Sequence, residues 1–410
     1  MRARDLAKRI SVRGLLRPLV RLRAPCVLAV TGSHGKTTTT LLLARLYGAA
    51  GYRVTACTTE GVFRDGRLIH VGDFAGANGI WRALRADRPQ VLVAETARGG
   101  LIKWGAGFAH CDAAAVTCIG ADHLGMAGLT SRAQLAEVKG EIVARVRPGG
   151  VVALNADEPL TRGLAARTSL APTWITARPA TVAGPAVFPR DGQLWRRDAA
   201  GEHVLLELDR IHLLDGGLRP YNLTAAGIAV ALAHGLHDRL PVPDEVLRAV
   251  LTDFGRAPGD VPCRNELVRW GDDWLLLGSA THPIAAEQDA TLIAGLRARL
   301  DVARVNLVLT AFEDRGPAAV REYAGLLGAA SDRAWVRPSR LTPAAAAPAL
   351  VQALCAGLGA LPHEVEDGRP LEELAREDAA RGPGPRLWVI TLARYQPGFD
   401  AERYRGAAAG

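Results

Sequence analysis

The stretch CVLAVTGSHGKTTTTLLLARL, residues 26–46, limits the possible folds of this chain most strongly. It begins as a short apolar strand, passes through a turn that contains Gly32 and Gly35, and ends in a helical pattern. Glycine allows backbone N–H groups to approach anionic oxygens closely, and a helix N-terminus attracts negative charge. Lys36 adds a positive charge, and Thr37 adds a hydroxyl that can bind Mg²⁺. The stretch therefore predicts a nucleoside triphosphate site.

The turn departs from the longest form of the phosphate-binding pattern. That pattern has a further glycine at position 30, where this chain has Val30, so the motif is a shortened GxxGKT. Ser33, His34 and Thr38 complete the segment that would surround the phosphates. An ordinary strand–turn–helix with an accidental GKT is the alternative, and the flanking strand and helix patterns favour the phosphate site.

Strand and helix patterns alternate through the first 160 residues, which predicts a parallel α/β sheet. Residues 53–61 predict a second strand that runs into a loop through Gly79. Further apolar strands end at Glu95 and at the pair Asp122 and His123. Because ligands bind at the carboxyl ends of parallel strands, we expect Thr37, Glu95 and His123 to lie together as a candidate Mg²⁺ site. A hydrogen-bonded loop cap is the alternative for the Asp122–His123 pair.

The second half of the chain predicts another domain. Residues 174–218 are irregular, helical patterns return after them, and GRAPGDVPCR has the composition of a linker. Beyond it, four strands with helical patterns between them predict a second, smaller α/β domain of Rossmann type. We therefore expect a basic arm at 1–24, a P-loop domain at 25–254, a hinge linker at 255–263 and a C-terminal domain at 264–410.

The composition narrows the classes of function. The net charge of +8 comes from arginines scattered among acids, without a dense basic block or aromatic platform, which disfavours nucleic-acid binding. Six cysteines without zinc or CxxC spacing are typical of reduced thiols, and no segment is long and apolar enough to span a bilayer. We therefore expect a cytoplasmic protein. The spacing of apolar residues in the arm fits a short amphipathic helix, more typical of docking than of membrane binding.

Several motifs occur in the order found in Mur ligases. They are TGSHGKTTTT at 31–40, ETARGG at 95–100, ADHLG at 121–125, AEVKG at 136–140, LNADEP at 154–159 and YNLTAAGIAVA at 221–231. The chain resembles this family, in particular the Mur-ligase-like part of cyanophycin synthetase, and more distantly poly-γ-glutamate synthase and folylpolyglutamate synthase. The likeness extends from about Val27 to Ala233 and fades beyond the linker.

The resemblance implies an ATP-dependent ligase. In the family, ATP phosphorylates a substrate carboxylate, and an amine attacks the acyl phosphate to give an amide, ADP and phosphate. The resemblance implies that Thr37 and Glu95 hold one Mg²⁺, and that His123 with a carbamylated Lys139 holds a second. With Lys36, these residues are the candidate catalytic set. A plain surface lysine is the alternative for Lys139.

The resemblance also assigns nucleotide contacts outside the P-loop and exposes departures from the family. Asn222 matches the position that recognises adenine, and Arg264 matches an arginine that reaches ATP from the C-terminal domain. Cys118 and Ser279 stand where relatives usually have Asn and Asp, whereas His282 still corresponds to a family histidine. The expected substrates are a small-molecule or peptide carboxylate and an amine. A catalytically weakened nucleotide-binding partner of a biosynthetic complex is the alternative, a plain phosphotransferase is disfavoured, and an oligomer is left open.

Overall fold

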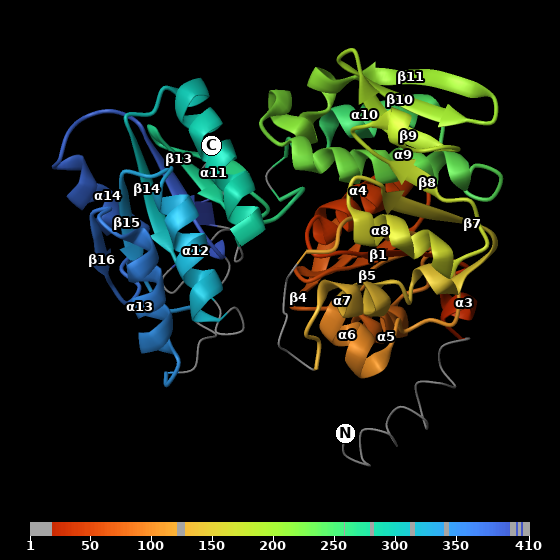
Figure 1. The fold of residues 1–410 in the computed structure, drawn as a ribbon, viewed down its shortest axis with the longest axis horizontal. Helices are drawn as coiled ribbons and strands as arrows, with labels where there is room; N and C mark the ends of the chain where they lie inside the picture. The colour runs from red at the N-terminus through yellow and green to blue at the C-terminus, as the bar shows by residue number, and fades with distance from the viewer. Residues whose placement is uncertain are drawn as a thin grey trace. The chain divides into compact units, whose positions relative to one another are not determined.

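The computed structural model describes residues 19–120, 128–257, 259–278, 283–311, 316–339, 344–393, 399–400 and 403–404. The chain divides into two compact units, Met1–Arg256 and Ala257–Gly410 (Figure 1). This division falls inside the segment predicted as the linker, and the exact domain bounds stay predictions. None of the helices in the described ranges has the length and hydropathy that crossing a membrane requires.

The first unit is built on an eleven-stranded sheet in the order β11-β10-β9-β8-β7-β6-β1-β5-β2-β3-β4. Seven neighbouring strands in the middle of this order pair in parallel, namely β9, β8, β7, β6, β1, β5 and β2. The strands at both edges pair antiparallel. The strands are β1 (Cys26–Thr31), β2 (Val54–Cys57), β3 (Gly61–Arg64), β4 (Arg67–Val71), β5 (Val91–Glu95), β6 (Cys111–Val116), β7 (Val146–Asn155), β8 (Thr173–Ile175), β9 (Ala186–Arg190), β10 (Gln193–Asp198) and β11 (Gly201–Glu207).

Helices cover both faces of this sheet. Figure 1 shows α4 and α9 on one side of β1 and β5, and α5, α6 and α7 on the other. Strand β1 is buried along its whole length, as expected of a central parallel strand between two helix layers. The helices are α3 (Val20–Arg23), α4 (Lys36–Ala49), α5 (Ala77–Ala86), α6 (Arg98–Trp104), α7 (Arg132–Lys139), α8 (Pro159–Gly163), α9 (Leu223–Gly235) and α10 (Asp244–Asp253), with 3₁₀ turns η2 (Val143–Arg145), η3 (Leu164–Arg167), η4 (Pro179–Thr181), η5 (Leu208–Arg210), η6 (His212–Gly217) and η7 (Pro220–Asn222).

Two expectations about the first unit are wrong. The segment predicted as a loop through Gly79 forms the hairpin β3–β4 and then the start of α5. Asp65 and Gly66 adopt positive φ angles of 47° and 79°, which matches the twist that a tight hairpin turn requires. Strand β6 ends at Val116, so the Asp122–His123 pair does not end it, and that pair lies outside the described residues.

The second unit is a six-stranded sheet in the order β12-β13-β17-β14-β15-β16, in which only the β12–β13 pair is antiparallel. The α/β fold class is therefore confirmed, although the sequence predicted four of these strands and missed β12 and β16. The stacked rings of Trp335 and Trp388 lie in its core. The elements are β12 (Glu266–Trp270), β13 (Asp273–Leu277), α11 (Pro283–Leu300), β14 (Arg304–Leu309), α12 (Pro317–Gly328), β15 (Arg333–Val336), α13 (Ala347–Leu358), β16 (His363–Val365), α14 (Leu371–Ala379) and β17 (Arg386–Ile390).

Candidate active site

The predicted phosphate loop connects the end of β1 to the start of α4. Gly35 is the N-cap of α4 and has a left-handed backbone with φ 72°. Gly32 has φ 151°, and a Cβ built on it would come within 1.9 Å of Thr117 Oγ1. The turn therefore leaves no room for a side chain at Gly32, and it leads into a helix N-terminus, where anions are favoured. This geometry fits a phosphate chain.

The loop is anchored to the segment that follows β6. The Ser33 amide donates to the carbonyl oxygen of Cys118 at 2.9 Å, and the Gly120 amide donates to Ser33 Oγ at 2.7 Å. The His34 amide donates to Cys118 Sγ at 3.4 Å. Lys36 Nζ donates to the Ser33 carbonyl oxygen at 3.1 Å, so its ammonium group lies against the loop that it was predicted to serve. These bonds hold the turn in one conformation.

Thr37 and Glu95 meet beneath the loop, as expected from the strand ends. Thr37 Oγ1 donates to Glu95 Oε2 at 2.9 Å, and both residues are buried. Thr59 joins them, because its hydroxyl lies 3.1 Å from Thr37 Oγ1 and its amide donates to Glu95 Oε2 at 3.2 Å. No sequence pattern had singled out Thr59. Its signal was the TTEG segment directly after β2, the parallel neighbour of β5.

Lys139 is the last residue of α7 and lies inside the molecule. Only 1% of it is exposed, and its Nζ donates to the carbonyl oxygen of Gly32 in the phosphate loop at 2.6 Å. Helix α7 is held at its start by a capping box between Ser131 and Gln134. The alternative of a plain surface lysine is therefore wrong, since the side chain is buried and reaches the predicted phosphate loop from another helix.

The other predicted site residues make different contacts or lie outside the described residues. Thr38 is buried in the first turn of α4. Asn222 precedes α9, and its Nδ2 donates to the Leu213 carbonyl oxygen at 2.8 Å. Arg264 belongs to the second unit, where Nη1 donates to the carbonyl oxygen of Cys263 at 3.3 Å. The positions predicted at His123, Ser279 and His282 lie outside the described residues.

The donor set around Glu95 fits a hard divalent cation. It consists of one carboxylate and two threonine hydroxyls, and Mg²⁺ prefers such oxygen ligands together with phosphate oxygens and water. Within the described ranges, no group of three His, Cys, Asp or Glu side chains could bind a metal by itself. Burial raises the pKa of the nearby Cys57 thiol to about 12, so this sulfur stays protonated. The site thus fits an ion that arrives with a nucleotide.

The chain is similar to known ligases over much of its length. Residues 30–177 match the family described as Mur ligase middle domain. The cyanophycin synthetase of Trichormus variabilis (strain ATCC 29413 / PCC 7937) is 31% identical over 269 residues, which are 64% of this chain and 29% of that protein. The UDP-N-acetylmuramoylalanine–D-glutamate ligase of Roseiflexus sp. (strain RS-1) is 33% identical over 268 residues, 63% of this chain and 51% of that protein. The chain thus spans about half or less of these relatives.

A solved structure shows that the fold extends over both units. The bifunctional folylpolyglutamate synthase/dihydrofolate synthase of Yersinia pestis, complexed with AMPPNP and a Mn ion, aligns with a TM-score of 0.63. The alignment covers 95% of this chain and 91% of that protein, at 17% sequence identity. Residues 30–177 therefore match the Mur ligase middle domain, and the resemblance that the motifs indicated is confirmed over this segment.

Proposed function

We propose that this chain is an ATP-dependent ligase that joins a carboxylate to an amine. The observation that carries the proposal is the cluster beneath the phosphate loop, where Thr37 bonds to buried Glu95 and Lys139 reaches the loop at Gly32. The relatives support the reaction class, since one is named a D-glutamate ligase and another a cyanophycin synthetase. The AMPPNP and Mn complex of the Yersinia enzyme supports a nucleotide with a divalent metal.

The phosphate loop would bind and orient ATP. The backbone amides in the first turn of α4, directly after Gly35, would hold the phosphate oxygens. Lys36 would neutralise charge that develops as the γ-phosphoryl group is transferred. Thr37 and Glu95 would hold Mg²⁺, which lowers the repulsion between the phosphates and an incoming carboxylate.

The proposed reaction has two displacements. A carboxylate oxygen of the acid attacks the γ-phosphorus, the bond to the β–γ bridging oxygen breaks, and ADP leaves with both electrons. The amine then attacks the carbonyl carbon of the acyl phosphate, phosphate leaves, and the amine loses a proton to give the amide. Phosphorylation is needed because a carboxylate is a poor electrophile, and the attack of one anion on another requires the positive charge gathered at this site.

Further roles carried over from the family belong to the same proposal. A carbamylated Lys139 would offer an anionic oxygen next to Gly32 and would hold a second Mg²⁺ with His123. Asn222 would recognise adenine, and Arg264 would reach ATP when the second unit closes. The proposed substrates are small molecules or peptides.

The test is substrate-dependent release of ADP with a panel of carboxylic acids and amines, with hydroxylamine added to trap an acyl phosphate as a hydroxamate. We expect ADP release that requires an acid, and a hydroxamate formed in its place when the amine is left out. The Glu95→Gln variant should lose turnover. Tight ATP binding without stimulation by any pair would instead favour the catalytically weakened nucleotide-binding partner.

A further inference from the structure

A pocket lies at the same edge of the first unit's sheet as the phosphate loop. It has a volume of about 400 Å³ and lies between the segments that follow β7 and β8. The carboxyl ends of parallel strands are where α/β sheets bind their ligands. The lining residues are Ala156, Asp157, Pro159, Arg162, Gly163, Arg178 and Thr181.

The walls of this pocket carry more positive than negative charge. The lining includes two arginines, Arg162 and Arg178, and one acidic residue, Asp157. Asp157 is engaged with its own loop, because its two oxygens accept from Thr176 Oγ1 at 2.6 Å and from the Ala177 amide at 2.7 Å. Its nearest approach to Arg178 is 3.7 Å, longer than a hydrogen bond. The pocket is therefore suited to an anion.

The two arginines keep donors for such an anion. Arg162 uses Nη2 to hold the opposite wall, donating to the carbonyl oxygen of Thr181 at 3.0 Å. Arg178 has a side chain that is 68% exposed, and among the described residues its guanidinium makes only the 3.7 Å ion pair. Two guanidiniums around one space favour carboxylate or phosphate groups, whose oxygens accept in pairs from a guanidinium.

Direct contacts connect the segment beside the pocket to the phosphate loop. Asn155 Nδ2 at the end of β7 donates to the Thr117 carbonyl oxygen at 2.9 Å, and Thr117 lies against Gly32 of the loop. Neighbouring strands lie about 4.8 Å apart, and β7 and β8 are the second and third strands from β1, so the two sites are roughly 10–15 Å apart. An extended peptide covers this distance with about three or four residues.

We propose that this pocket binds a distal anionic group, carboxylate or phosphate, of an elongated acid substrate whose other end is activated at the phosphate loop. The inference rests on the proposed function for the identity of the bound molecule as the acid. It assigns the substrate class as a peptide-like acid with a second negative charge about three residues from the reacting carboxylate. Arg162 and Arg178 determine that specificity.

Isothermal titration calorimetry tests the pocket with three peptides in the presence of Mg²⁺ and AMPPNP. Succinyl-Ala-Ala-Ala and acetyl-phosphoserine-Ala-Ala each carry a distal anion, and acetyl-Ala-Ala-Ala lacks one. We expect at least one charged peptide to bind roughly tenfold more tightly than the acetyl peptide, and their ratio identifies carboxylate or phosphate. Equal affinity of all three peptides, or no binding, overturns the proposal.

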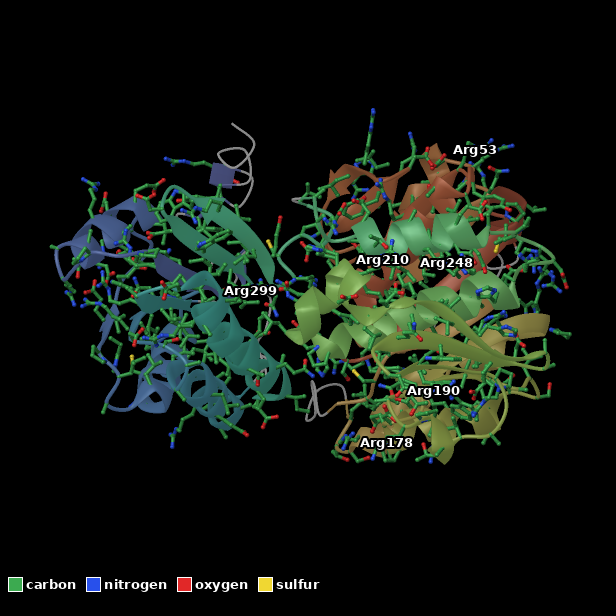
Figure 2. All side chains as sticks on the ribbon, turned by 90° about the horizontal axis from the view of Figure 1, so that it is seen from above. Arg53, Arg178, Arg190, Arg210, Arg248 and Arg299 are labelled. Carbon is green, nitrogen blue, oxygen red and sulfur yellow. The ribbon has the colours of Figure 1, made fainter. Side chains whose placement is uncertain are left out.

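Variants of arginines in the first unit test the two pocket arginines against an arginine outside the pocket. The double variant Arg162→Ala, Arg178→Ala should lose the preference for the charged peptide. Arg210→Ala should keep it, because Arg210 has a similar exposure of 63% and a similar ion pair, 3.5 Å from Glu207, but does not line the pocket. Figure 2 labels Arg178 and Arg210 on separate parts of the unit. A preference that survives in the double variant refutes the assignment.

This experiment separates the two proposals because it requires no turnover. A chain that prefers the charged peptide but never releases ADP keeps the pocket and loses the ligase function. A ligase that acts equally well on acids with and without a distal charge keeps the function and loses the pocket. Urea unfolding of each variant verifies that the exposed arginines were removed without loss of the fold.

Discussion

Replacing Gly32 by alanine probes the turn on which the proposed nucleotide binding depends. The new Cβ would lie 1.9 Å from Thr117 Oγ1, 3.1 Å from Thr117 Cβ and 3.2 Å from the Cys118 amide nitrogen. The φ angle of 151° adds backbone strain, since side chains rarely adopt it. Overpacking costs about 1–3 kcal/mol and a disfavoured backbone about 1–3 kcal/mol, so Gly32→Ala should lower the free energy of unfolding by about 2–6 kcal/mol.

Movement of the loop away from Thr117 would relieve part of this strain, and then ATP should bind more weakly. Urea unfolding and calorimetric titration with ATP measure the two effects together. Gly51→Ala is the control, because Gly51 also has a positive φ, 90°, but no atom would lie within 4 Å of its Cβ. Adding Thr117→Ala to Gly32→Ala removes the 1.9 Å contact and should restore part of the loss. The reasoning is refuted if Gly32→Ala matches Gly51→Ala in stability and keeps the ATP affinity of the unaltered chain.

Three further predictions concern single positions. Lys139→Ala should reduce acid-dependent ADP release by roughly two orders of magnitude, because it removes a buried group that contacts the phosphate loop, and full turnover would contradict its role. Asp112→Asn should lower the free energy of unfolding, measured in urea, by about 2–4 kcal/mol, because this buried carboxylate accepts from the Val27 amide at 2.9 Å and pairs with Arg147. A loss below about 1 kcal/mol would contradict a stabilising role of this carboxylate. MgATP should slow the labelling of Cys118 by N-ethylmaleimide, measured by mass spectrometry, because the sulfur of Cys118 accepts a hydrogen bond from the His34 amide of the phosphate loop. An unchanged labelling rate would place the phosphates elsewhere.

Much of the first unit could be predicted because its parallel strands are buried apolar runs. The strands that end at Thr31 and Glu95 are each fully buried, so their hydrophobicity alone indicates their bounds. The meeting of Thr37 with Glu95 followed from one rule, that ligands collect where parallel strands end. The shortened glycine pattern indicated the turn because its two glycines are the two residues of the turn with positive φ angles.

Other features could not be predicted because tertiary contacts decide them. Strand β4 is exposed along its length, and its sequence RLIHV lacks the apolar–polar alternation of a half-buried strand. Pairing with β3 decides that this segment is a strand. Strand β16 has three residues, too few for a pattern. Thr59 has no motif of its own and reaches Glu95 only because β2 lies beside β5. The contact of Lys139 with Gly32 joins residues more than a hundred positions apart.

The central claim is that ATP activates a carboxylate as an acyl phosphate at the Thr37–Glu95 site. The most direct measurement labels the carboxylate of the best stimulating acid with ¹⁸O and follows the released inorganic phosphate by mass spectrometry. Attack by the carboxylate on the γ-phosphorus leaves one carboxylate oxygen on phosphate, so phosphate should carry one ¹⁸O for each amide formed. Amide formation with unlabelled phosphate, or a panel in which no acid stimulates ADP release, would contradict the account.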